Sequence, residues 1–201
     1  MAVYSADSFT ALEIPTLAKM NKLWTNDASM NDGNGIGTGV INNRHFAAGV
    51  VVQEAIGVDT TVKTGTTLIP YDSSIPQNNE GTEFMTFTFT PKAATNRLII
   101  DVLANLYHGN TTQQNTAIAL FQDSVANAIA AQTYVAALNA GSLGAPTPLR
   151  HTMIAGTTSP ITFKVRVGPQ VSGTVTFNGI GGGGFFGGVM RSSIKVTEIK
   201  V

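Results

Sequence analysis

The segment Pro160–Pro169, PITFKVRVGP, decides the fold of this chain. Apolar residues occupy every second position of it, and threonine, lysine and arginine stand between them. A period of two is typical of a β-strand with one buried and one exposed face, and prolines bound the segment at both ends. The sequence therefore predicts a strand whose inward residues are Ile161, Phe163, Val165 and Val167.

Two segments earlier in the chain have a related pattern. Phe84–Thr90, FMTFTFT, sets Met85, Phe87 and Phe89 on one face and threonines on the other. In Arg97–His108, RLIIDVLANLYH, every second residue from Leu98 to Leu106 is apolar, and some of the residues between them are apolar too. Because a strand with two apolar faces is usually buried on both sides, we expect this segment to be covered on both faces.

Further candidate strands follow the same logic along the chain. They are Thr61 to Pro70, Asn115 to Asp123, Ala128 to Ala136, Leu149 to Ala155, Gly173 to Asn178 and Ser192 to Val201. Turn residues separate them, and no strong helical repeat lies between them. The sequence predicts a mostly β fold, an antiparallel sandwich, for which a jelly roll fits best.

The glycine run Phe177–Gly188, FNGIGGGGFFGG, allows three readings: a phosphate-binding loop, a membrane segment or a turn. A phosphate loop opens a helix, but the residues that follow, VMRSSIKVTEIKV, favour a strand. A membrane-spanning helix needs about 18 apolar residues, so we expect no membrane insertion. We predict a loop between strands, with Phe185 and Phe186 anchoring it on the sandwich or on a neighbouring subunit.

The N-terminal residues differ from the remainder and predict an arm, residues 1–57, before a head domain at 58–201. Pro15–Trp24 has the spacing of one short amphipathic helix, and residues 25–39 are rich in Asn, Asp and Gly. The apolar side chains of this helix either pack on the chain's own sandwich or form a docking or threefold bundling surface. They are Leu17, Met20, Leu23 and Trp24.

Composition limits the partners and the chemistry. The chain has 12 Lys and Arg against 12 Asp and Glu, so it offers no field that would attract nucleic acid. It has no cysteine, which excludes disulfides, thiol nucleophiles and thiolate metal sites. Its N-terminus lacks a basic region followed by an apolar one, so we expect no export by a signal peptide.

No catalytic signature stands out, and we expect no enzyme, no cofactor and no bound metal. His45, His108 and His151 lie far apart, without the spacing that places two ligands on one helical face. Carboxylates could supply the pair that glycoside hydrolysis needs, but the sequence favours no particular pair. The candidates are Glu80, Glu83, Asp101 and Asp123.

Two regions resemble the short fibre proteins of tailed bacteriophages. SFTALEIPTLAKMNKLWTND (8–27) and INNRHFAAGVV (41–51) are similar to the N-terminal segments of those fibres. The later segments are similar to the trimeric jelly-roll heads at fibre ends, which are related to tumour-necrosis-factor and C1q heads. These segments are FTPKAATNRLIIDVLANL, AIALFQD, PITFKVRVGP, GTVTFNG, GGGGFFGG and SSIKVTEI.

The resemblance implies a homotrimeric virion protein, a short head or tail fibre assembled in the host cytoplasm. Its arm would bind capsid, neck or tail proteins, and its β head would face outward for host attachment. The chain departs from longer fibres because it has no coiled-coil, collagen-like or β-helical shaft, which limits its reach. The alternatives are a capsid decoration protein that stabilises the particle and a carbohydrate-binding or glycan-active module.

Host contact, in this interpretation, falls on the polar loop YHGNTTQQN, Tyr107 to Asn115. Its amide and aromatic groups suit hydrogen bonding to, and stacking on, a surface glycan. The predicted recognition residues are Tyr107, His108, Asn110, Gln113 and Gln114.

Overall fold

The computed structural model describes residues 48–109, 114–136 and 144–201. All of them belong to one compact unit, which begins at Phe46. Within these ranges, no helix has the length and apolar character that crossing a membrane requires. The predicted helix at 15–24 and its cluster Leu17, Met20, Leu23 and Trp24 lie outside the described residues.

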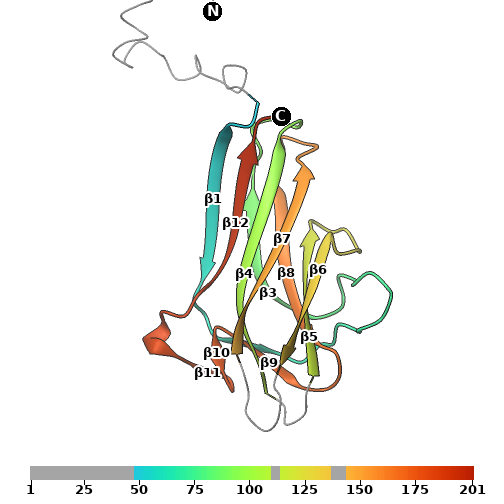
Figure 1. The fold of residues 1–201 in the computed structure, drawn as a ribbon, viewed down its shortest axis with the longest axis vertical. Helices are drawn as coiled ribbons and strands as arrows, with labels where there is room; N and C mark the ends of the chain where they lie inside the picture. Colours follow the sequence, from blue (N-terminus) through green and yellow to red (C-terminus); the bar gives the residue numbers. More distant parts are fainter. Residues whose placement is uncertain (1–47, 110–113, 137–143) are drawn as a thin grey trace, which may run out of the picture. The chain divides into compact units, whose positions relative to one another are not determined.

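The unit is built from two antiparallel sheets (Figure 1). The first sheet has the order β1 (Val51–Asp59), β12 (Ser192–Ile199), β4 (Arg97–Gly109) and β7 (Gly144–Ile154). At the lower end of β4, β9 (Thr174–Phe177) and β2 (Lys63–Gly65) take the place of β12 and β1. The second sheet has the order β3 (Thr82–Phe89), β8 (Ile161–Pro169), β5 (Gln114–Gln122) and β6 (Ala130–Ala136).

The eight long strands pair in a nested way. The first pairs with the last, β1 with β12, and the next pairs inward are β3 with β8, β4 with β7 and β5 with β6. This nesting across two sheets is the arrangement of a jelly roll. The predicted fold class, a mostly β antiparallel sandwich, is confirmed.

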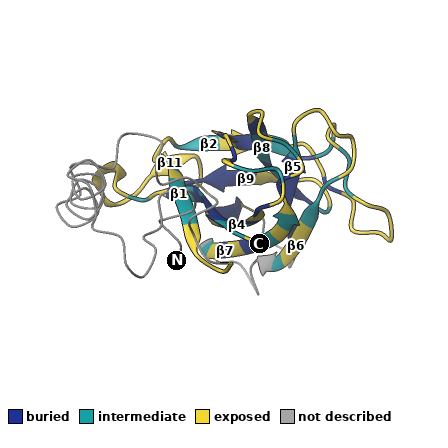
Figure 2. Ribbon diagram, turned by 90° about the horizontal axis from the view of Figure 1, so that it is seen from above, coloured by how far each residue is buried: buried dark blue, intermediate teal, exposed yellow. Residues whose placement is uncertain are grey.

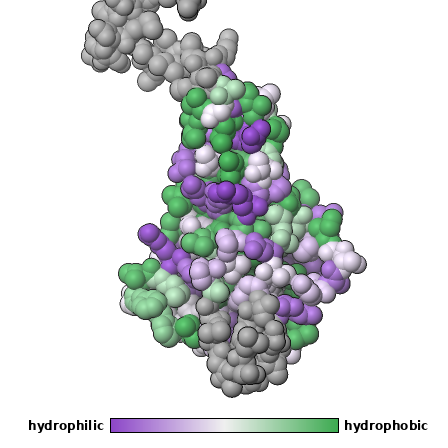
Figure 3. All heavy atoms as spheres, viewed as in Figure 1, coloured by the Kyte–Doolittle hydropathy of each residue, from purple (hydrophilic) through white to green (hydrophobic). Residues whose placement is uncertain are grey.

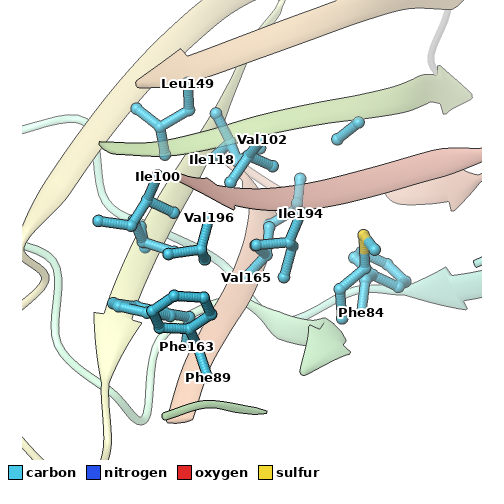
Figure 4. Packing of buried hydrophobic residues seen from close by; sticks show 14 of the residues in the cluster. Phe84, Phe89, Ile100, Val102, Ile118, Leu149, Phe163, Val165, Ile194 and Val196 are labelled. Atoms are coloured by element: carbon cyan, nitrogen blue, oxygen red, sulfur yellow. The ribbon is translucent and has the colours of Figure 1, made fainter. Parts of the chain in front are cut away.

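The core lies between the two sheets and is formed by the predicted alternating residues. Ile161, Phe163, Val165 and Val167 are all buried, as are the inward residues of β4 from Leu98 to Leu106. Figure 4 shows Phe89 and Phe163 packed against Val196 and Ile100 of the opposite sheet. Phe84 stacks on Phe177 with ring centroids 5.2 Å apart, so aromatic burial extends to the lower end of the sandwich.

A second apolar cluster lies on the outer face of the second sheet and corrects one predicted strand. Thr61–Pro70 was predicted as a strand, but only β2, Lys63–Gly65, is one. The following residues cross the outside of β5 and β8, where Ile69 is buried and its N–H donates to the Pro169 carbonyl at 3.1 Å. The covered residues of β5 are Ala117, Ala119 and Phe121.

The strand β1 crosses the boundary that we predicted between arm and head at residue 57. Its residues Ala55 and Gly57 face the core, and a Cβ on Gly57 would lie 2.5 Å from the Phe87 ring. Residues 51–57 therefore belong to the sandwich, because their period-two pattern finds a partner in β12. The arm itself stays a prediction.

Two short elements complete the unit. The strands β10 (Gly179–Ile180) and β11 (Gly183–Gly184) form a small hairpin, and a 3-10 turn η1 (Phe186–Gly188) follows it. They lie between β9 and β12, so the glycine run is a loop between strands, as predicted.

Candidate functional site

The predicted recognition loop contains two residues that are not on the surface. Tyr107 and His108 are 6% and 1% exposed. They are buried because β4 continues to Gly109 and β9 pairs with its end, His108 lying opposite Val175. Neither side chain is an exposed recognition residue in the described structure. Asn110 and Gln113 lie outside the described residues, and Gln114 is the first residue of β5.

The His108 imidazole is buried at the end of β4. Among the described residues, neither of its ring nitrogens has a hydrogen-bond partner. The Gly173 backbone packs on the ring so closely that a Cβ there would lie 2.1 Å from Nε2. Because burial disfavours the charged imidazolium, the pKa of His108 is lowered from its ordinary value.

This burial predicts a loss of stability in mild acid. The pKa of His108 is lower in the folded than in the unfolded state, so the unfolded chain takes up the proton first as pH falls. The stability is thus complete above the unfolded pKa of about 6.5 and decreases as pH falls from there toward the folded-state pKa. Urea unfolding at several pH values should show this slope, and the His108→Leu variant should flatten it.

His151 is the matched control for this experiment. It lies on β7, where partial burial also lowers its pKa. Because His151 is less buried, His151→Leu should flatten the slope less than His108→Leu does. An unchanged slope in His108→Leu would contradict the assignment.

The base of the glycine-rich loop is fixed by a buried polar network. Asn178, which has a positive φ of 55°, donates from Nδ2 to the Asp59 carbonyl at 2.7 Å. The Ser192 hydroxyl donates to Asn178 Oδ1 at 2.7 Å and accepts from the Asn105 N–H at 2.9 Å. The two ends of the loop are thereby joined to each other and to β1 and β4.

The tip of this loop is exposed and apolar. Phe186 and Val189 are 72% and 74% exposed, and Phe185 lies beside Phe186 with ring centroids 6.0 Å apart. In Figure 3 this loop is a hydrophobic patch at the lower left of the molecule. Among the described residues, the sandwich therefore does not bury Phe186, and anchoring of the loop on a neighbouring subunit stays a prediction.

An apolar hollow of about 150 Å³ lies at the base of the same loop. It is bounded by the lower ends of β4 and β7 on one side and by the loop on the other. Asn105 is the main polar residue of its wall. The wall is formed by Asn105, Leu106, Ala145, Pro146, Gly179, Ile180 and Met190.

The outer faces of the two sheets differ in character. On the second sheet the outward residues of β3 and β8 are mainly threonine, lysine and arginine. On the first sheet a charged band runs across the middle, with Arg150 paired to Asp101 and Lys195 to Glu54. Apolar side chains flank this band on both sides. The exposed ones are Val51, Ile56, Val58, Leu103 and Ile154.

Leu103 shows most directly that no described residue covers the outer face of the first sheet. It lies on β4, between Ser193 of β12 and Pro148 of β7, and is 44% exposed. The sequence predicted that β4 is covered on both faces, but the described unit covers only one. The sequence indicated this surface, because β4 has apolar residues on its outward face as well as on its inward face.

The four candidate carboxylates are only partly brought together. Glu83 and Asp123 line one polar hollow of about 280 Å³ on the second sheet, whereas Asp101 lies on the first sheet. Glu83 accepts from the Thr86 hydroxyl at 2.7 Å, and Asp123 accepts from the Thr162 N–H at 2.8 Å. Both carboxylates thus have structural hydrogen bonds, and the expectation that the chain is not an enzyme stays a prediction.

Residues 57–201 match a family model described as the Pgp3 C-terminal domain. No curated protein matches. Among solved structures, dimeric latent PorU from Porphyromonas gingivalis is similar at 8% identity and a TM-score of 0.36, over 77% of this chain and 14% of that one. The infectious bursal disease virus VP2 subviral particle is similar at 13% identity and a TM-score of 0.33, over 75% of this chain and 38% of that one.

The chain therefore spans less than two fifths of the length of these two proteins. With TM-scores this low, the likenesses do not establish a common fold.

Proposed function

This chain belongs, through residues 57–201, to the family of the Pgp3 C-terminal domain, and on that premise we propose that it is a structural protein that works as a homotrimer. In its particle it is a short head or tail fibre of a bacteriophage, held by the N-terminal arm. The jelly-roll head faces outward and is available for attachment to a host surface. The trimer interface is the outer face of the sheet β1–β12–β4–β7.

The observation that carries this proposal is the set of apolar side chains on both sides of the charged band of the first sheet, which the described residues leave exposed. Large apolar patches on a soluble protein usually mark a surface that contacts another protein. Apolar residues on both faces of β4 indicate that this strand is buried on both sides in the assembled protein. The second sheet needs no such partner, because its outer face is polar and partly covered by the segment that contains Ile69.

Two further observations favour a structural role on a particle. The segments 8–27 and 41–51 resemble the N-terminal arms of phage fibres, which bind other virion proteins. The 12 basic and 12 acidic residues of the whole chain balance, so the chain has no net charge with which to bind nucleic acid. Attachment through the arm and assembly through the head are therefore separate tasks of separate segments.

Leu103→Lys tests the interface. Sedimentation equilibrium of the full chain should give a trimer, and Leu103→Lys should weaken its association by about 100-fold, because a lysine would be buried without a partner in an apolar interface. Thr88→Lys, which introduces the same charge on the outer face of the second sheet, should remain trimeric. A wild-type chain that sediments as a monomer at micromolar concentration would overturn the proposal.

A further inference from the structure

The loop between β9 and β12 carries its apolar tip on a fixed base. Asn178 and Ser192 join the two ends of the loop in a buried network, and Asn105 Nδ2 donates to the Arg191 carbonyl at 2.5 Å. Phe185 and Phe186 pack edge to face. A loop held in this way loses little conformational entropy on binding, which favours affinity.

The chemistry of the tip indicates a protein partner with an apolar cavity. From Gly179 to Met190 the loop carries no charged side chain, and Phe186 is its most exposed aromatic residue. Aromatic residues are enriched in protein interfaces, and the contacts that contribute most to binding lie in well-packed pockets from which water is excluded. The tip offers one such side chain, and the described part of its own chain leaves that side chain in solvent.

A cavity of suitable size and chemistry lies on the same chain. The hollow at the loop base has about 150 Å³ and is bounded mainly by apolar residues, among them Leu106, Pro146 and Met190. A thioether is a favourable neighbour for an aromatic ring. Because Asn105 and Pro146 lie on the outer face of β4 and β7, the hollow is continuous with the apolar face that we assign to the trimer interface.

We propose that Phe186 of one protomer occupies the hollow of the neighbouring protomer in the trimer. This inference rests on the proposed function, because it needs the threefold assembly. Phe186 and the hollow are different surface patches of one protomer, so the contact is head-to-tail, and such a contact closes into a ring when the rotation fits. The second copy of this chain is therefore the partner of the glycine-rich loop.

Disulfide cross-linking of the full chain tests this contact, and the absence of native cysteine makes it unambiguous. The test protein carries Phe186→Cys and Pro146→Cys. Mild oxidation should give covalent dimers and trimers on a denaturing, non-reducing gel. The single variants should give no covalent trimer. The control pair, Phe186→Cys with Thr88→Cys on the second sheet, should give none either.

The other outcomes separate this inference from the proposed function. If the test protein sediments as a trimer but oxidation gives only monomers, the loop contact is overturned and the trimer stands. If the wild-type chain sediments as a monomer, both are overturned.

A membrane is the other candidate for an apolar tip, and a third measurement covers it. Wild-type chain that floats with vesicles of phosphatidylcholine and phosphatidylglycerol, when Phe186→Ser does not, would assign the tip to lipid and overturn the contact. Because Phe186 is exposed, Phe186→Ser should keep the wild-type circular dichroism spectrum.

Discussion

The Glu198→Ala variant should have a free energy of unfolding lower by about 4 kcal/mol. Glu198 is fully buried at the upper end of the first sheet. Its carboxylate accepts from Gln53 Nε2 at 2.6 Å, from Asn96 Nδ2 at 2.7 Å and from the Lys92 and Ala93 N–H groups at 2.9 and 3.1 Å. Alanine would leave these donors without their acceptor, and unpaired buried donors are costly.

Glu54→Ala is the control, because Glu54 is a half-exposed carboxylate on the same sheet. It accepts from the Thr197 hydroxyl at 3.0 Å and pairs with Lys195 at 3.4 Å. Exposed pairs of this kind contribute less than about 1 kcal/mol. Urea unfolding at one protein concentration would measure both variants. Equal losses of unfolding free energy in the two variants would show that Glu198 does not stabilise the loop that contains Lys92, Ala93 and Asn96.

The Gly168→Ala variant should lose about 3 kcal/mol of stability through overpacking. A Cβ at Gly168 would lie 2.6 Å from two main-chain atoms of the covering segment, the Ile69 nitrogen and the Thr67 carbonyl oxygen. Backbone cannot move aside as a flexible side chain can. The covering segment would have to shift, which would expose Ala119 and Phe121 of β5.

Gly109→Ala controls for the loss of a glycine as such. A Cβ at Gly109 would lie 3.5 Å from the Tyr107 ring, an ordinary contact distance. We expect its free energy of unfolding to change by less than about 0.5 kcal/mol. Thermal unfolding of the two variants side by side measures the difference. A Gly168→Ala protein as stable as Gly109→Ala would mean that the covering segment packs loosely.

The strands of the core were predictable from the sequence because one physical rule governs them. Where one face of a strand is buried and the other meets water, as in Ile161–Pro169, the apolar residues alternate and the alternation is visible. Thr61–Pro70 was mispredicted since its apolar residues do not enter a ladder. Ile69 instead packs on the outside of a sheet, and the period of two describes only residues that lie within a strand.

The candidate site was less predictable, because exposure depends on what packs where. Tyr107 and His108 stand in a polar, amide-rich stretch that resembles a loop, yet β9 pairs with them and buries them. The apolar residues on the second face of β4 predicted a cover over Leu103, but the described residues supply none. A single chain does not say whether that cover is its own segment or another copy.

The pairing of the first strand with the last sets the direction in which the unit resists a pulling force. The Lys200 N–H donates to the Val50 carbonyl at 2.9 Å, and the Gly49 N–H donates to the Lys200 carbonyl at 2.8 Å. The glycine-rich loop is attached at the other end of β1, where Asn178 bonds to Asp59 (Figure 1). A pulling force applied between Val50 and this loop would act along β1.

Such a load shears the ladder between β1 and β12. Its hydrogen bonds from Val51 to Asp59 then resist together, rather than opening one after another. Figure 2, which looks down the sandwich from above, shows β1 beside the glycine-rich hairpin, with β4 and β9 nearby. A force applied between Val50 and the base of the glycine-rich loop would therefore be resisted by the whole β1–β12 ladder.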